Sequence, residues 1–256
     1  MIVVSLSKVP EPMPENITPY KDTLEGKKEQ LTRMFDTISN EYDGLNRIIS
    51  FGRDVRWRKK VVRLVKNSAP NSILDIATGT GDLAIALADT GASRIVGLDI
   101  SPGMLAVGKR KIAQEKLNDQ VTMVVGDSEA LPFRDASFDA ITVAFGVRNF
   151  ENLEKGLTEI YRVLKPGGIL VVLETSVPTK RLYKFGYRIY TKYILPLIGR
   201  CLSKDRAAYA YLSESAAAFP HGQAFNNILA KIGFIGMEHK PQTFGAASIY
   251  VATKHP

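Results

Sequence analysis

The residues from Ser72 to Asp82 constrain the fold of this chain more than any other stretch. The apolar run Ile73–Ile76 is typical of a short buried strand. It ends in Thr78-Gly79-Thr80-Gly81, and apolar residues then recur at helical spacing from Leu83 to Leu87. A strand, a glycine turn and a helix in this order place backbone N–H groups beside a nucleotide-like ligand. The glycines remove side chains where that ligand must approach the backbone.

Two carboxylates flank this loop and bear on which nucleotide it holds. Asp82 stands at the start of the helix, where it would repel the pyrophosphate of a dinucleotide. Asp75, just before the turn, adds a second negative charge. A cationic ligand suits such a loop, and S-adenosylmethionine carries both a sulfonium and an ammonium group. The pattern therefore favours S-adenosylmethionine as the cofactor.

Strand and helix patterns alternate through most of the chain. After the first strand, further strands are expected at 94–99, 121–125, 138–145, 169–173, 234–241 and 247–253. Between them, Ser101-Pro102 opens one helix as a cap and first-turn proline, and periodic apolar residues mark others at 153–164 and 225–232. This alternation predicts an α/β fold with a doubly wound, mostly parallel, seven-stranded Rossmann-like sheet.

The length of 256 residues suits one large domain, with additions at its front. Residues 1–28 carry four prolines among charges and are expected to form a flexible leader. Residues 29–70 are expected to form an N-terminal helical cap, with helices at about 31–38 and 54–66 separated by a break over 42–52. Residues 71–256 form the cofactor-binding domain, with a helical insertion at about 178–215.

Composition excludes several kinds of protein. The single cysteine, Cys201, excludes an intrachain disulfide and a cysteine-based metal cluster, and the scattered histidines His221, His239 and His255 predict no metal site. No apolar run is long enough for a membrane span, and the start lacks a signal-peptide pattern, so a cytoplasmic location is expected. The net charge of +8 is compatible with nucleic acid, an anionic membrane surface or no specific partner.

Three aspartates, Asp75, Asp99 and Asp127, lie at or just past the ends of three successive predicted strands. Ligands of open α/β sheets bind beyond the carboxyl ends of the strands. Asp99, about twenty residues beyond the glycine loop, is predicted to accept hydrogen bonds from both ribose hydroxyls. Asp127, with Ser128 beside it, is predicted to accept from the adenine amino group. Alternatively each acid only caps a loop or helix, but three in register behind a glycine turn favour a cofactor site.

Six stretches of the chain carry a resemblance: Met34–Asp43, Leu74–Asp82, Gly97–Leu105, Gly126–Phe133, Ala144–Asn149 and Leu164–Gly168. They resemble the class I S-adenosylmethionine-dependent methyltransferases, and more narrowly the demethylmenaquinone and 2-polyprenyl-6-methoxy-1,4-benzoquinol C-methyltransferases of menaquinone and ubiquinone biosynthesis. The resemblance runs from about residue 30 to the C-terminus. The glycine loop is generic to methyltransferases, whereas Phe145–Asn149 and Tyr42-Asp43 are more specific to the quinone group.

The resemblance implies methyl transfer to a ring carbon of a reduced, prenylated quinone precursor, most simply demethylmenaquinol to menaquinol. The alternatives are the benzoquinol precursor of ubiquinone and another small phenolic or lipid acceptor. Ala144 stands where related sequences often have serine, so only its backbone is expected to contact the cofactor. With this contact, the predicted cofactor-binding set is Asp75, Gly79, Thr80, Gly81, Asp99, Asp127, Ser128 and Ala144.

Arg148 and Asn149 follow the fourth strand and are expected to face the methyl acceptor, which makes them the candidate catalytic residues. Arg148 is suited to stabilise a developing phenolate oxygen. The alternative for Arg148 is a structural ion pair with a neighbouring acid. Tyr42 and Asp43 are candidates for a lid, although a helix-ending turn explains them nearly as well. No residue is assigned as the general base.

The insertion at 180–206 combines basic and apolar stripes. Arg181, Lys184, Arg188 and Lys192 share one helical stripe, and Leu182, Phe185, Ile189 and Tyr193 share an adjoining one. Such a helix can lie on an anionic bilayer, where a polyprenyl substrate resides, and would then place the protein peripherally at the inner face of the membrane. Alternatively it covers a channel for the prenyl tail or packs on the sheet with its charges in water.

Three rival functions use the same cofactor domain. Enzymes that methylate exocyclic base nitrogens usually carry an Asn- or Asp-Pro-Pro-aromatic turn after the fourth strand, and uracil C5 methylation needs a cysteine at the site. This chain has Ala144–Asn149 after that strand and its cysteine in the insertion, so no nucleic-acid partner is expected. A cofactor-sensing module would not need the cap and the insertion. An enzyme for another phenol or a sterol would use both as its pocket.

Overall fold

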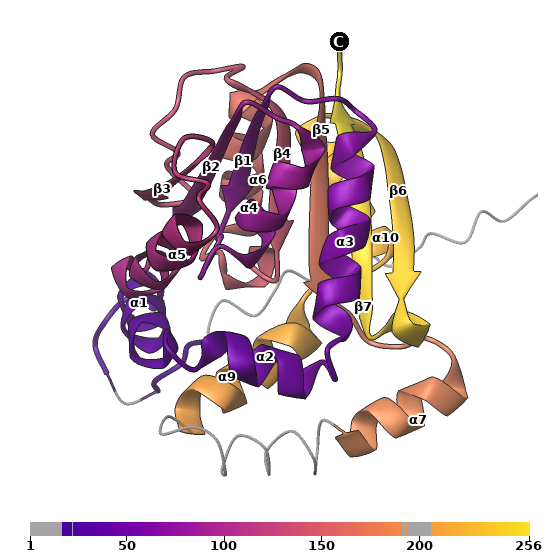
Figure 1. Ribbon diagram of the computed structural model, residues 1–256. Coiled ribbons are helices and arrows are strands. Elements are labelled where there is room, and N and C mark those ends of the chain that lie inside the picture. The colour runs from indigo at the N-terminus through magenta and orange to yellow at the C-terminus, as the bar shows by residue number, and fades with distance from the viewer. Residues whose placement is uncertain (1–16, 22, 191–192, 194–205) are drawn as a thin grey trace, which may run out of the picture.

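The computed structural model describes residues 17–21, 23–190, 193 and 206–256. Seven strands form one sheet in the order β3-β2-β1-β4-β5-β7-β6. Strands β1 to β5 pair in parallel, and β7 runs antiparallel to both of its neighbours. The predicted doubly wound, mostly parallel sheet is thereby confirmed (Figure 1). The strands are Ser72–Ile76 (β1), Arg94–Asp99 (β2), Val121–Val125 (β3), Phe138–Ala144 (β4), Leu164–Thr175 (β5), Phe234–Gln242 (β6) and Ala247–Lys254 (β7).

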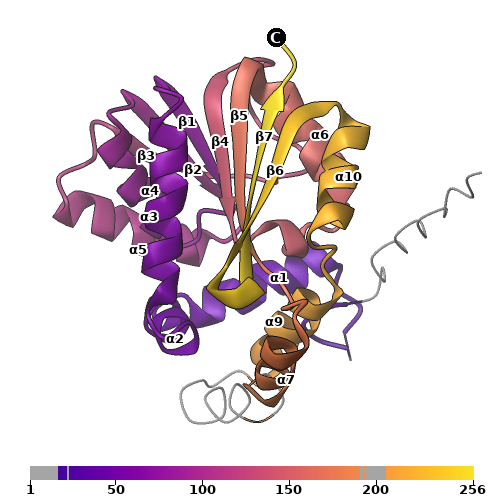
Figure 2. The same cartoon turned by 90° about the vertical axis from the view of Figure 1, so that its right-hand side faces the viewer.

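Helices cover both faces of this sheet (Figures 1 and 2). On one face lie α3 (Arg53–Lys66), α4 (Asp82–Ala86) and α5 (Pro102–Gln114), and on the other lie α6 (Leu153–Val163) and α10 (Gln223–Ile232). Neighbouring strand residues alternate between the two layers, because side chains in a strand point to opposite faces. Ile73 and Leu74, both fully buried, accordingly belong to different core clusters.

A second group of helices lies along the end of the sheet where the parallel strands finish (lower part of Figure 1). It consists of α1 (Lys27–Ile38), α2 (Tyr42–Ile49), α7 (Arg181–Ile189) and α9 (Arg206–Ala218). Leu31 and Met34 of α1, Leu45 of α2 and Tyr211 of α9 form a separate apolar cluster with Met104 of α5. This cluster holds a helical layer over the edge at which ligands of such sheets bind.

The region 42–52 differs from the expectation. The first cap helix does end before Tyr42, but the segment expected only as a break contains helix α2. Gly44 and Asn46 carry turn propensity, which the burial of Leu45 (4% exposed) against α1 outweighs. Sequence propensity alone was a weaker influence here than tertiary packing.

Two further boundaries differ from the sequence reading. The helix after the glycine loop is short, and a 3-10 helix, Leu87–Thr90, follows α4 directly. Strand β5 begins at Leu164 and passes through Pro166-Gly167-Gly168, which were expected only to stop the preceding helix. The pairing of β4 with β5 shifts register between Phe138 and Ala140, so that a bulge accommodates the proline and glycines.

The leader and the insertion are described in part. Helix α1 begins at Lys27, within the stretch expected to be a leader, and residues 1–16 and 22 lie outside the described residues. Of the insertion, α7 and α9 are described, whereas Lys192 and the side chains of Leu182 and Arg188 are not. Within the described parts of the chain, no helix is both long and apolar enough to cross a membrane.

Candidate active site

The glycine loop between β1 and α4 adopts a conformation that requires its glycines. Gly79 and Gly81 have φ angles of +58° and +79°, in the left-handed region that favours glycine. A Cβ at Gly81 would lie 2.3 Å from the Met123 methyl carbon. The Gly79 N–H donates to Oδ2 of Asp99 over 2.8 Å and thereby ties the loop to the end of β2.

Asp75 lies beside this loop and lines neither of the two cavities described below. Only 1% of it is exposed, and its two carboxylate oxygens accept hydrogen bonds of 2.6 Å from the hydroxyls of Thr78 and Thr142. Burial raises the pKa of Asp75 to about 6, and the two hydroxyl hydrogen bonds oppose that rise. Asp75 thus connects the loop to β4 and does not line the site itself.

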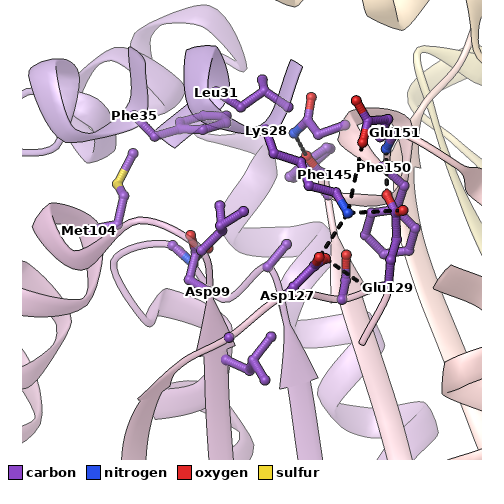
Figure 3. A pocket seen from close by; sticks show the side chains of 18 of the residues that line it. Lys28, Leu31, Phe35, Asp99, Met104, Asp127, Glu129, Phe145, Phe150 and Glu151 are labelled. Atoms are coloured by element: carbon purple, nitrogen blue, oxygen red, sulfur yellow. Dashed lines mark hydrogen bonds and ion pairs between the residues drawn. The ribbon is translucent and has the colours of Figure 1, made fainter. Parts of the chain in front are cut away.

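The first cavity lies between α1 and the carboxyl ends of the parallel strands, and it encloses about 700 Å³, its open mouth included (Figure 3). From α1, Leu31 and Phe35 point toward it across from Asp99 and Asp127. The predicted residues that line it are Gly79, Asp99, Asp127, Ser128, Ala144 and Asn149. Residues from four separate strand ends therefore meet in one place, as the sheet topology predicts.

Asp99 is a buried acid on the wall of this cavity, with 8% of it exposed. Its carboxylate accepts from the backbone N–H groups of Gly79 and Ser101, over 2.8 and 2.9 Å. Burial raises the pKa of Asp99, and the backbone hydrogen bonds oppose that rise. The side chain is thus held in a fixed position at the end of β2, where it can accept further hydrogen bonds from a ligand.

Lys28 of α1 reaches into an acidic cluster at the mouth of the first cavity (Figure 3). Its Nζ lies 2.8 Å from Asp127 Oδ2, 3.1 Å from Glu129 Oε2 and 3.9 Å from Glu151 Oε2. Burial alone would raise the pKa of Asp127, but the hydrogen bond from Lys28 lowers it. Sequence reasoning missed Lys28, although its spacing of three and seven residues from Leu31 and Phe35 places all three on one helix face.

Thr80, Gly81 and Asp82 do not line the first cavity. Thr80 donates through Oγ1 to Asp43 over 2.5 Å, and Lys111 bridges Asp43 (2.9 Å) and Asp82. Asp82 also lies 3.6 Å from the Arg58 guanidinium. The charge of Asp82 is therefore matched by two cations on the far side of the loop, and the acids facing the cavity are Asp99, Asp127, Glu129 and Glu151.

A second cavity adjoins the first and encloses about 970 Å³, its opening included. Tyr42 and Phe145 line both cavities and so form their shared wall. The remainder of the second cavity is largely aromatic and aliphatic. Its other lining residues include Ile49, Trp57, Tyr187, Tyr190, Leu212, Ala216 and Ala246, from helices α2, α3, α7 and α9 and the β6–β7 connection.

Arg148 lines the second cavity and is paired with a buried acid. Its Nη1 donates to Oε1 of Glu174, and both side chains are buried, at 5% and 0% exposed. Burial alone would lower the pKa of Arg148, but the Glu174 carboxylate outweighs this effect and keeps the guanidinium charged. Within the described residues, Arg148 Nε has no hydrogen-bond partner. The ion pair considered from the sequence exists, and a donor of the same side chain stays available.

Asn149 follows Arg148 on the same 3-10 helix, Val147–Asn149, but lines the other cavity. Its Oδ1 accepts from the Tyr211 hydroxyl of α9 over 3.1 Å. The two candidate catalytic residues are thus adjacent in sequence but line different cavities, Arg148 the second and Asn149 the first. A ligand in each cavity would meet at Tyr42 and Phe145.

Comparison with known proteins identifies relatives of this chain. The model of the ubiE/COQ5 methyltransferase family matches residues 23–254. The chain is 45% identical to a demethylmenaquinone methyltransferase of Bacteroides fragilis, over 94% of this chain and 98% of the relative. It is 44% identical to a ubiquinone/menaquinone biosynthesis C-methyltransferase of Geobacter sulfurreducens, over 93% of each chain.

Solved structures agree on the fold. A phosphoethanolamine N-methyltransferase 2 of Haemonchus contortus, solved with S-adenosylhomocysteine, matches with a TM-score of 0.55 at 20% identity, over 73% of this chain and 49% of that chain. The likeness shows a methyltransferase fold. The family match confirms the predicted methyltransferase activity and with it the predicted cofactor, S-adenosylmethionine. The chain belongs to the ubiE/COQ5 methyltransferase family.

Proposed function

We propose that this chain transfers a methyl group from S-adenosylmethionine to a ring carbon of demethylmenaquinol and so forms menaquinol. One observation carries the proposal: the first cavity, which four acids line, and the second cavity, where Trp57, Tyr187 and Tyr190 lie, share a wall formed by two further aromatic residues, Tyr42 and Phe145. The names of the relatives support the acceptor class. The benzoquinol precursor of ubiquinone is the second candidate, because the Geobacter sulfurreducens relative is named for both quinones.

The first cavity fits a cationic nucleoside, since the four carboxylates that face it outnumber the Lys28 cation beside them and apolar side chains of α1 cover it. Asp99 would accept the ribose hydroxyls, because its carboxylate is already oriented by two backbone N–H groups. Asp127 and Ser128 would meet the adenine edge, and Gly79 and Ala144 would leave room for contact with their backbone. The bound cofactor supplies an electrophilic methyl group.

The second cavity would hold the quinol ring among aromatic side chains, with Trp57, Tyr187 and Tyr190 as its apolar walls. Arg148 would stabilise the phenolate oxygen that develops next to the attacking carbon, through the Nε–H that no described residue accepts. Glu174 holds the guanidinium in place through the Nη1 hydrogen bond. Holding a ring carbon against the shared wall is a large part of the catalysis, since methyl transfer depends chiefly on alignment.

The prenyl tail implies a location beside a membrane. We propose a peripheral position at the inner face of the membrane, with contact through residues 180–206. Of that segment, residues 191–192 and 194–205 lie outside the described residues. The exposed basic residues Arg181 and Lys184 of α7 support this contact, because cations near an anionic bilayer are attracted to it.

The proposed function is tested with S-adenosylmethionine labelled in its methyl group. Purified protein is given reduced short-tail demethylmenaquinone and, separately, the benzoquinol precursor of ubiquinone. We expect label on the naphthoquinol ring carbon and its loss in Asp99→Ala, because that variant lacks the carboxylate that orients the ribose. Transfer to the benzoquinol alone would select the second candidate, and transfer to neither, with cofactor binding intact, would refute both.

A further inference from the structure

Large apolar side chains stand exposed on three elements beside the second cavity. Phe51 lies in the turn between α2 and α3, Phe244 in the 3-10 helix Thr243–Gly245 between β6 and β7, and Phe185 and Ile189 on α7. They are 72%, 65%, 66% and 41% exposed, respectively. Exposed aromatic side chains that gather in one place mark an interaction surface.

Ring contacts join these elements into one surface. The Tyr183 ring of α7 stacks on Phe244, with centroids 4.3 Å apart, and Tyr190 at the other end of α7 lies 5.9 Å from Phe51. The Tyr190 hydroxyl also donates to the Ile49 carbonyl oxygen over 2.6 Å. Helix α7 therefore spans the distance between the two turns, and both views show α2, α7 and the β6–β7 turn at the same end of the molecule (Figures 1 and 2).

Two of the exposed rings sit on strained backbone. Phe51 and Phe244 have φ angles of +52° and +59°, a region that bulky residues rarely occupy. Each position thus combines an unfavourable backbone conformation with a phenyl ring that stays largely exposed beside one tyrosine. Neither feature contributes to the packing of the described core, and strain of this kind accompanies functional surfaces.

The surroundings of these side chains are cationic. Residues 175–190 contain four lysines and arginines and no acid, and residues 47–66 contain eight with Asp54 as the single acid. Asp54 is buried and pairs with Arg58. Among the described residues, no acidic side chain forms a salt bridge with the exposed cations of the two segments, which include Arg47, Arg53, Arg56, Lys180, Arg181 and Lys184.

We infer that Phe51, Phe185, Ile189 and Phe244, with the cations around them, form a surface that seats on an anionic lipid bilayer. Cations of this kind attract anionic headgroups, and the apolar side chains can then enter the boundary with the acyl chains. The inference rests on the proposed function for its purpose, since a prenyl tail leaving the bilayer would meet α7, whose Tyr187 and Tyr190 line the second cavity. The inference extends the proposed membrane contact beyond the insertion, to the two turns that carry Phe51 and Phe244.

Flotation with lipid vesicles tests this inference. The wild-type chain is mixed with phosphatidylcholine vesicles that contain or lack phosphatidylglycerol. We expect binding to the anionic vesicles, weakening as salt rises because exposed charges are screened. The variant Phe51→Ser/Phe185→Ser/Phe244→Ser should bind at least about tenfold more weakly, since each phenyl ring loses apolar burial. The variant Arg53→Glu/Arg56→Glu should also bind more weakly, by about fivefold for each cation lost.

The matched control is Ile235→Ser. Ile235 is 41% exposed, like Ile189, but lies at the start of β6, at the end of that strand opposite the 3-10 helix that carries Phe244. We expect its vesicle binding to stay within about twofold of the wild type, because it lies outside the proposed surface. Unchanged affinity of the triple variant for S-adenosylhomocysteine verifies that its fold is intact, as none of its three residues lines a cavity.

Several outcomes would overturn the inference. Wild-type protein that does not float, a triple variant that floats equally well, or equal binding to neutral vesicles would each do so. A wild-type dimer that the triple variant converts to monomer would instead make the surface an interface between two copies. Methyl transfer to a short-tail quinol in detergent is measured separately, so binding without transfer refutes the proposed function alone, and transfer without binding refutes the surface alone.

Discussion

The two cavities are built in different ways, although they share a wall. The first is formed mainly by loops at strand ends, and its acids are held by backbone hydrogen bonds or by Lys28. The second is formed mainly by helices that lie outside the sheet, and its walls are aromatic. One of its charged contacts, between Arg148 and Glu174, is buried away from water, and another joins Asp54 to Arg58.

This difference indicates which parts of the fold serve cofactor binding and which serve acceptor binding. A cofactor common to many enzymes is bound by the part of the fold that the sheet topology determines. The acceptor, in our proposal, is bound by elements added to that fold, whose positions depend on contacts between distant segments. Three predictions separate the two regions, and they follow in order of decreasing effect.

The largest effect is expected from Arg148→Met in the second cavity. This change leaves the Glu174 carboxylate buried without its partner and should lower the free energy of unfolding by about 3 to 5 kcal/mol. Urea unfolding measures the loss. In Arg148→Met/Glu174→Gln, which removes both charges, at least half of the lost stability should return, while methyl transfer stays absent and affinity for S-adenosylhomocysteine is preserved.

Methyl transfer by that double variant at the wild-type rate would limit Arg148 to a structural ion pair. Such a result would mean that the charge of Arg148 in the second cavity does not contribute to catalysis. A loss of less than about 1 kcal/mol in the single variant would show that the pair is solvated.

The free energy of unfolding is expected to depend on pH through Asp75, which lies beside the glycine loop of the first cavity. The pKa of Asp75 is about 6 in the folded chain and about 3.8 when unfolded. Between these values the folded state retains a proton that the unfolded chain has lost, so stability should fall by about 2 kcal/mol as pH rises from 4 to 6. Asp75→Asn cannot titrate, and the difference in unfolding free energy between it and the wild type should follow this slope.

Other titrating groups cancel in that difference because both proteins contain them. Urea unfolding at intervals of half a pH unit is sufficient to resolve the slope. A difference that does not vary with pH would mean that Asp75 is hydrated, and that the loop is less firmly connected to β4 than its two hydroxyl hydrogen bonds indicate.

A smaller loss of stability is expected from a substitution at Gly146, where the loop after β1 meets the loop after β4. Ala77 has a φ angle of +51°, and a Cβ at Gly146 would lie 2.4 Å from the Ala77 Cβ. Gly146→Ala should therefore destabilise the fold by about 1 to 3 kcal/mol through overpacking. Ala77→Gly/Gly146→Ala should restore most of this stability, because it removes the clashing methyl group. Thermal unfolding measures the stability of both variants. A double variant that is no more stable than Gly146→Ala would show that the two methyl groups do not clash.

The first cavity could be predicted from sequence to a large extent. Asp99 and Asp127 were found because parallel strands end at the same edge of a sheet, so acids that follow successive strands must meet there. Thr80 and Asp82 show the limit of this reasoning. Their partners lie far along the chain, Asp43 37 residues before Thr80 and Lys111 29 residues after Asp82, and no local pattern predicts which side of the loop they face.

The second cavity could not be assembled from sequence. Its walls come from Trp57, Phe145 and Tyr187, each separated from the next by tens of residues, and each aromatic side chain is equally typical of a core. Arg148 was found only through its position after the fourth strand and the family resemblance. Its partner Glu174 lies on the neighbouring strand, where register determines the contact.

The central claim is that two ligands occupy separate cavities that meet at Tyr42 and Phe145, and a matched pair of variants tests it most directly. Ala144 lines the first cavity only, and Ala216 lines the second only. Calorimetric titration with S-adenosylhomocysteine should show an affinity loss of at least about tenfold in Ala144→Phe, because the ring fills the cofactor site. Ala216→Phe should keep that affinity within twofold while losing methyl transfer to the quinol. Equal loss of S-adenosylhomocysteine affinity in the two variants would contradict the account.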